Sequence, residues 1–148
     1  MTVLVRLTMM LAGYAVACLA AALVLALGTL APHWNEVFAP LGPQPPQLQS
    51  AAMWVVVCLG AIVIFFVGFL PTLLVVIIAE GLALRSVVAY GAIGGALALA
   101  MAYGLDFAGY IAPAGIDIAR EREVFAAAGI AGGLVYWLFA GRSAGAWK

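Results

Sequence analysis

The sequence has 148 residues, of which 68% are hydrophobic and 8% are charged, and its acidic and basic residues balance to a net charge of zero. A soluble domain typically carries about 25% charged residues, so this composition excludes a water-soluble globular protein. A neutral chain also lacks the basic field that attracts nucleic acids. We therefore expect no nucleic-acid partner, and the composition predicts a membrane protein.

Four apolar stretches without Asp, Glu, Lys or Arg take up most of the chain. They cover residues 7–31, 53–79, 86–105 and 124–140. About 20 apolar residues are enough for a helix to cross roughly 30 Å of hydrocarbon. The sequence therefore predicts an all-α integral membrane four-helix bundle that forms a single domain over residues 1–148, with the lipid bilayer around it.

The connection between the first two stretches, residues 32–52, contains five prolines and no Lys or Arg. Proline removes a backbone donor and fixes φ, which predicts an irregular and partly extended loop. The loop is either a docking surface for a partner or a plain connector.

The second stretch contains a proline and ends at a charged turn. Pro71 lies inside it and predicts a kink. Glu80 and Arg85 then frame the short turn to the third stretch. Two interpretations stay open for this pair: an interfacial ion pair that orders the hairpin, or a proton or cation site at Glu80.

Glycines recur with the same spacing in the third and fourth stretches. The shared pattern is G-x-x-G-G, formed by Gly91, Gly94 and Gly95 and by Gly129, Gly132 and Gly133. Small residues four apart allow two helix backbones to approach closely in a membrane. We expect these two helices to pack tightly, within one subunit or across a homo-oligomer, and a weaker pattern of small residues occupies the first stretch.

The second outer loop, residues 106–123, ends in a charged segment that is expected to continue as helix into the fourth stretch. Basic residues favour the cytoplasmic side. Four of them (Arg6, Arg85, Arg142 and Lys148) fall on the side of the termini, against Arg120 and Arg122 on the other side. Both termini are therefore predicted to be cytoplasmic.

Aromatic residues mark the two expected membrane interfaces. Trp34 and Trp54 lie near the two ends of the first outer loop, which is the connection over residues 32–52. Tyr136 and Trp137 lie near the inner end of the fourth stretch. Trp and Tyr collect at headgroup depth because one end of the ring is apolar and the other can form hydrogen bonds. We expect these four residues to anchor the helices at the interfaces.

The sequence contains no Ser-His-Asp set, zinc motif, CxxC or phosphate-binding loop. An enzyme is not expected, and neither is a cofactor or a metal site. The preferred hypothesis is a non-catalytic accessory subunit, or an assembly or scaffold factor, that binds other membrane subunits or itself. The alternative is a small homo-oligomeric transporter or channel that uses Glu80. It has the size of the small multidrug-resistance exporters but lacks their acidic residue in the first helix.

The stretch from Gly132 to Arg142 (GGLVYWLFAGR) resembles the C-terminus of uncharacterised small four-span bacterial inner-membrane proteins. The turn from Glu80 to Arg85 and the glycines after it resemble the same family. The resemblance implies a bacterial inner-membrane location and no known activity.

Overall fold

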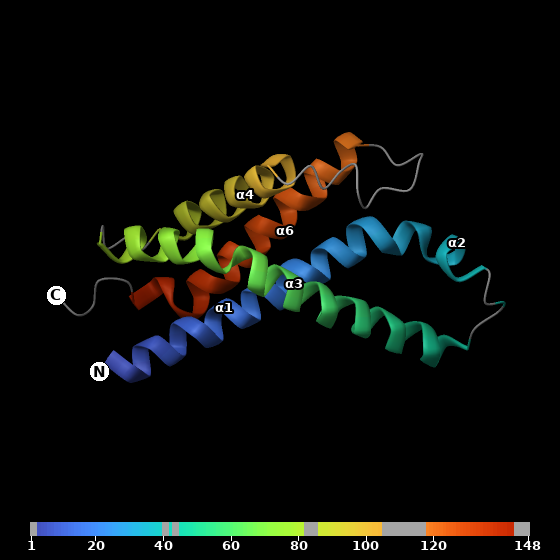
Figure 1. Ribbon diagram of the computed structural model, residues 1–148, viewed down its shortest axis with the longest axis horizontal. Coiled ribbons are helices and arrows are strands. Elements are labelled where there is room, and N and C mark those ends of the chain that lie inside the picture. The colour runs from blue at the N-terminus through green and yellow to red at the C-terminus, as the bar shows by residue number, and fades with distance from the viewer. Residues whose placement is uncertain (1–2, 40–41, 43–44, 82–85, 105–117, 144–148) are drawn as a thin grey trace.

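The computed structural model describes residues 3–39, 42, 45–81, 86–104 and 118–143, and every regular element in this part of the chain is a helix. The α-helices are α1 (Val3–Leu25), α2 (Trp34–Phe38), α3 (Pro46–Gly81), α4 (Val87–Gly104) and α6 (Ile118–Phe139) (Figure 1). A short 3-10 turn, Gly141–Ser143, follows α6. The predicted all-α class is therefore confirmed.

Three of the described helical segments are long and apolar enough to cross a membrane: Leu7–Glu36, Pro46–Ala79 and Arg120–Phe139. A fourth segment, Val87–Tyr103, is also apolar but shorter. Helix α6 begins at Ile118, so the charged segment before the fourth apolar stretch is helical from that residue onward, as predicted.

The structure differs from the sequence-based expectation around the proline-rich connection. Residues 32–39 were expected to be irregular, but the chain continues from α1 through a π-helical turn (Ala26–Leu30) and a 3-10 turn (Ala31–His33) into α2. Pro32 lies at the start of the 3-10 turn, where its missing N–H breaks no bond. Helix α3 likewise begins at Pro46 and not near residue 53. Residues 40–41 and 43–44 lie outside the described residues.

Helix α3 is the longest element, with 36 residues and Pro71 in its interior. Its ribbon bends partway along its length (Figure 1). A proline inside a helix removes one intrahelical hydrogen bond and clashes with the preceding turn, which accounts for such a bend.

Helices α1 and α6 form the centre of the molecule. Helix α6 packs against both α1 and α4, and α1 also packs against α3. The spatial order is therefore α3–α1–α6–α4. Helices α3 and α4 are consecutive in the chain but lie on opposite flanks, and Figure 1 shows them diverging from the end where they are connected.

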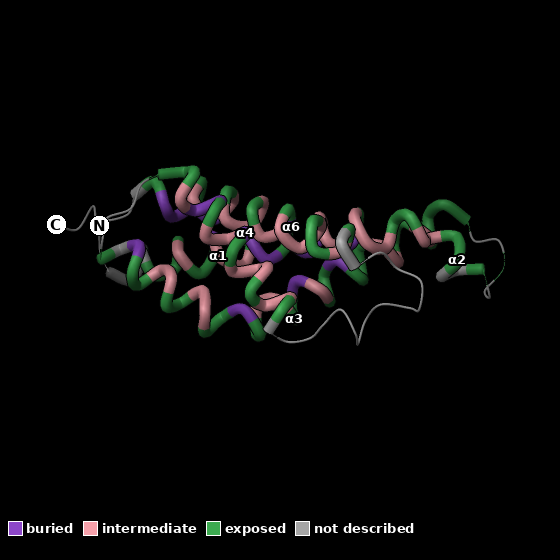
Figure 2. The backbone as a smooth tube through the Cα atoms, turned by 90° about the horizontal axis from the view of Figure 1, so that it is seen from above, coloured by how far each residue is buried: buried purple, intermediate pink, exposed green. Residues whose placement is uncertain are grey.

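The buried residues are mostly small. Those with hydrophobic side chains are Ala17, Cys18, Ala22, Ala26, Val57, Ala61, Ala79, Tyr90, Ala128, Tyr136 and Ala140, and the other buried residues of the described chain are Gly13, Gly68, Gly91, Gly95 and Gly141. Figure 2 shows them as short stretches on the inner sides of the helices, with exposed residues outside. Large side chains such as Phe66 and Leu70 are more than 70% exposed. Small residues inside and large apolar residues outside are typical of helices surrounded by lipid, where small residues at the interfaces allow close backbone packing.

Candidate functional site

The glycines of α4 and α6 bring these two helices into backbone contact. A Cβ added at Gly94 would overlap the carbonyl oxygen of Gly129, and a Cβ added at Gly129 would overlap that of Gly94. At Gly133 a Cβ would overlap the carbonyl oxygen of Tyr90, and at Gly95 it would lie 2.9 Å from Ile130 Cγ1. Glycine is therefore the residue that fits at these positions without moving the partner helix.

The same helix α6 approaches α1 through a second set of small residues. A Cβ at Gly132 would lie 3.3 Å from the carbonyl oxygen of Ala17, and one at Gly13 would lie 3.0 Å from Phe139 Cβ. Further along, a Cβ at Gly28 would overlap the side chain of Val124. Gly129 and Gly133 thus face α4, whereas Gly132, from the same G-x-x-G-G pattern, faces α1.

Helix α3 is attached to α1 by a seam of small residues and by hydrogen bonding between the two helices. Cys18, Ala22 and Ala26 pack against Val57 and Ala61 in one buried cluster. The seam fixes the α1–α3 pair at one place along α3.

The hydrogen bond comes from Tyr14 on α1. Its hydroxyl donates to the carbonyl oxygen of Phe65 at 3.0 Å and lies 3.5 Å from that of Ile64. A Cβ at Gly68 would lie 3.1 Å from this hydroxyl, so glycine leaves the space through which Tyr14 reaches the α3 backbone. The Tyr14 ring also lies 5.0 Å from the Phe65 ring, centroid to centroid.

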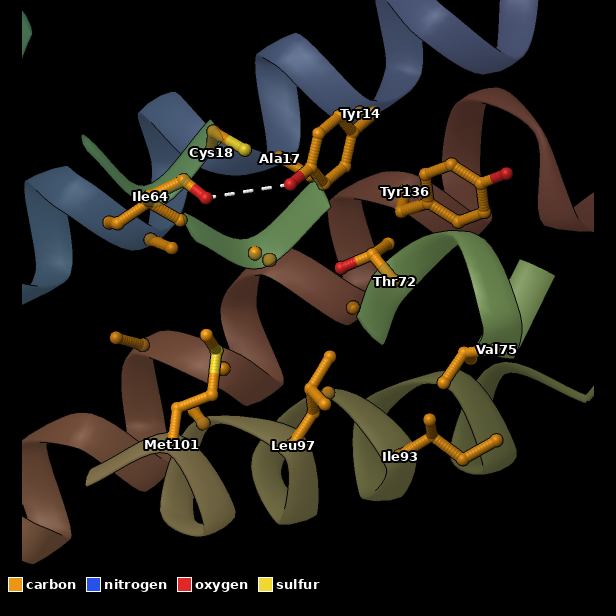
Figure 3. Close-up of a pocket in the computed structure, with 18 of the residues that line it drawn as sticks. Tyr14, Ala17, Cys18, Ile64, Thr72, Val75, Ile93, Leu97, Met101 and Tyr136 are labelled. Carbon is orange, nitrogen blue, oxygen red and sulfur yellow. Dashed lines mark hydrogen bonds between the residues drawn. The ribbon is translucent and has the colours of Figure 1, made fainter. Parts of the chain in front are cut away.

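A cavity of about 190 Å³ lies between the four long helices. Its floor is formed by α1 and α6 and its sides by α3 and α4 (Figure 3). Figure 3 shows Leu97 and Met101 of α4 on one side of it, with Tyr14 and Thr72 across from them. None of the described residues that line it is Asp, Glu, Lys, Arg or His. The cavity is therefore an apolar site whose polar side chains are uncharged hydroxyl and thiol groups.

A second cavity, of about 200 Å³, lies on the other side of Tyr14. It is bounded by the first part of α1 and by α3, with Leu7, Met10 and Phe69 among its lining residues. Four residues line both cavities: Tyr14, Thr72, Val76 and Tyr136. These residues therefore lie between the two apolar spaces.

The predicted anchors occupy different environments. Trp54 is 61% exposed, and Trp34 and Trp137 are half-buried. Tyr136, in contrast, is buried inside the bundle with its ring 5.9 Å from that of Tyr90. Its ring packs among residues of α1, α3 and α4, and its role as an anchor at the membrane interface stays a prediction. The hydropathy pattern could not indicate which side of α6 the tyrosine occupies.

The expected charged turn lies mostly outside the described residues. Glu80 belongs to the last turn of α3, and Arg85 lies among residues 82–85, which the structure does not describe. Other polar contacts of the described residues lie elsewhere in the chain. His33 Nδ1 lies 3.3 Å from Glu36 Oε2, and the Arg122 guanidinium lies 4.6 Å from the centre of the Tyr103 ring, linking the end of α4 to the start of α6. The described residues contain no group of three or more His, Cys, Asp or Glu side chains that could hold a metal ion.

Tyr14, Cys18 and Gly68 were not predicted from the sequence as site residues. A hydroxyl group within an apolar stretch was the available signal, because a polar group in hydrocarbon must find a partner. The acceptor of the Tyr14 hydroxyl, the carbonyl oxygen of Phe65, can be identified only from the packed structure, and so can the space that Gly68 leaves for the hydroxyl.

Comparison with known proteins gives no match: no family model fits the sequence, and neither a curated protein nor a solved structure is significantly similar to it. The resemblance of residues 132–142 to small four-span inner-membrane proteins stays a prediction.

The first prediction concerns the contact between α4 and α6. We expect Gly94→Ala to destabilise the protein by about 1–3 kcal/mol, the usual range for overpacking a tight interface. The matched control is Gly60→Ala, where an added Cβ would lie 3.6 Å from Ala22 Cβ, an ordinary contact. Unfolding by SDS titration in mixed micelles, followed by tryptophan fluorescence, measures both. Equal stability of the two variants would contradict the close packing.

The second prediction concerns the bond between α1 and α3. We expect Tyr14→Phe to lose about 0.6 kcal/mol, the average for hydrogen bonds between membrane helices. Tyr103→Phe is the matched control, because the ring of Tyr103 makes the contact with Arg122. The same SDS titration measures the difference, and a Tyr14→Phe variant as stable as the control would show that the hydroxyl contributes nothing.

Proposed function

We propose that this chain is a four-span protein of the bacterial inner membrane, with both termini in the cytoplasm, that acts as a non-catalytic accessory subunit or scaffold of a membrane complex. The observation that carries this proposal is the large apolar surface of α3 that contacts no other described part of the chain. Helix α3 packs against α1 and diverges from α4, so most of its surface has no protein neighbour among the described residues.

Helix α4 is proposed as the fourth crossing. Its 18 residues extend about 27 Å at 1.5 Å per residue, close to the thickness of the hydrocarbon core. Helix α1 begins and α6 ends at the same end of the molecule, and α3 ends there too (Figure 1). Because α6 begins at the opposite end, α4 must carry the chain across, which supports an even number of crossings.

Helix α3 is proposed as the surface that binds a partner. It is about 54 Å long, well beyond the roughly 30 Å that the bilayer requires. It also carries about half of the exposed large hydrophobic side chains of the described residues, including Phe66 and Leu70. A helix that projects beyond the bilayer and has a wide apolar face can meet a neighbouring membrane subunit both within the hydrocarbon and above it. Helix–helix association by packing then requires no catalytic group on this chain.

The topology can be tested directly. We expect a green fluorescent protein fused after Lys148 to fluoresce, because it folds in the bacterial cytoplasm, and an alkaline phosphatase fused there to be inactive. Fusions placed after Gly42 should give the opposite result. An active phosphatase at the C-terminus would contradict the proposed orientation.

The partner surface can be tested by photo-cross-linking in native membranes. We expect a photoreactive amino acid at Phe66 or at Leu70 to give a discrete adduct with a second membrane protein, identified by mass spectrometry. The matched control is Val88 on α4, which is as exposed as Phe66, at 74%. It should give lipid adducts alone.

Lipid adducts alone at all three positions would contradict the accessory-subunit proposal. Proton-coupled export by the purified, reconstituted chain, lost in Glu80→Gln, would replace it with the transporter hypothesis.

A further inference from the structure

The cavity between α3 and α4 is long and narrow. Its lining residues span positions 14–25 of the α1 segment, 90–101 of α4 and 125–136 of α6. Eleven residue steps on each helix correspond to about 16 Å at 1.5 Å per residue. Spread over that length, the volume of about 190 Å³ that is open to the centres of water-sized spheres corresponds to a passage roughly 7 Å wide, once the diameter of the sphere is added.

These dimensions restrict what can occupy the cavity. A helix with its side chains is about 10–12 Å across, too wide for this passage. Water is also a poor occupant, because an apolar cavity of comparable size, about 150 Å³, stays dry and binds small hydrocarbons. A flexible, unbranched apolar chain matches both the width and the length.

We propose that this cavity binds one acyl chain of a membrane phospholipid, which enters sideways between α3 and α4. The proposal rests on the membrane location argued above, because the lining residues lie in the segments that would cross the hydrocarbon core. Phospholipid chains are the abundant unbranched hydrocarbons at that depth. The described residues enclose the cavity only in part, so a chain can enter it from the bilayer.

The side chains around the passage suit methylene groups. Ile93, Leu97 and Met101 stand along α4, and Figure 3 shows them directed toward the side formed by α3. Methionine adapts its shape to irregular apolar partners. On the floor, small residues such as Gly132 keep the backbones of α1 and α6 close to the passage.

The polar groups of the cavity leave no place for a lipid headgroup. The Tyr14 hydroxyl already donates to the Phe65 carbonyl at 3.0 Å. The described lining residues carry no charged side chain that could pair with a phosphate. The bound chain therefore lies in the cavity while its headgroup stays at the membrane surface, so the site distinguishes lipids by chain and not by headgroup.

The test uses the full-length protein in vesicles of phosphatidylcholine that carries a diazirine in the middle of one acyl chain. After illumination, peptide mass spectrometry maps the labelled residues. We expect labelling concentrated on α4 residues 93–101 and on the facing part of α3, residues 72–76, above the level on the outer face of α3. Labelling should persist when phosphatidylglycerol with the same chain replaces phosphatidylcholine.

Variants that fill the passage provide the decisive comparison. We expect Leu97→Trp to reduce cavity labelling at least fivefold, whereas Ala96→Trp, at an exposed position on the same helix, should leave it within twofold. Val75→Phe and its exposed neighbour Leu74→Phe repeat the comparison from α3. The second pair keeps the test decisive if tryptophan at position 97 prevents folding, which circular dichroism and gel filtration report.

Labelling spread evenly over all exposed apolar residues, and unchanged by Leu97→Trp or Val75→Phe, would overturn the proposal. A wrong membrane location would give a different result. The protein would then be recovered without detergent and would not be incorporated into the vesicles.

Discussion

Backbone-to-backbone approach at small residues is the constraint on which this structure depends. In hydrocarbon, a leucine on the helix surface is solvated as well as one in a core, so burying large side chains does not drive association. Dispersion contacts and close packing remain, and both improve as helix axes approach. Gly94 and Gly129 let α4 meet α6, and Ala17 and Gly132 let α1 meet it from the other side. Helix α6 becomes the centre because small residues occupy both of these faces.

The position of the outer helices follows from that centre. Large side chains such as Leu70 and Val88 are exposed. Helix α3 packs against α1 and α4 packs against α6, and the described side chains between α3 and α4 do not close the space that remains. The cavity is therefore a consequence of tight packing elsewhere in the bundle.

The helical class and the approximate positions of the four apolar segments follow from the sequence, because hydropathy over about 20 residues reflects the solvent directly. The sequence did not indicate that α3 begins at Pro46 or that the chain stays helical through Pro32. Proline is compatible with the first turn of a helix as well as with a loop. The glycine pattern indicated packing surfaces but not which helix each glycine meets. The burial of Tyr136 and the bond from Tyr14 depend on how the helices are rotated about their axes. These helices are apolar on all sides, so no polar face distinguishes the side that meets lipid from the side that meets protein, and the sequence carries little information on that rotation.

The two walls of the cavity are attached to the centre of the bundle in different ways. On the α4 side, the wall is fixed by glycine contacts with α6. On the α3 side, the wall depends on the seam around Val57 and on the bond from Tyr14 to Phe65, six residues before Pro71. Beyond the proline the helix axis turns, so the part of α3 that carries Thr72 and Val75 takes its direction from a point close to that bond. Tyr14 therefore binds α3 near the turn, next to the part of the helix that lies across the cavity from Leu97.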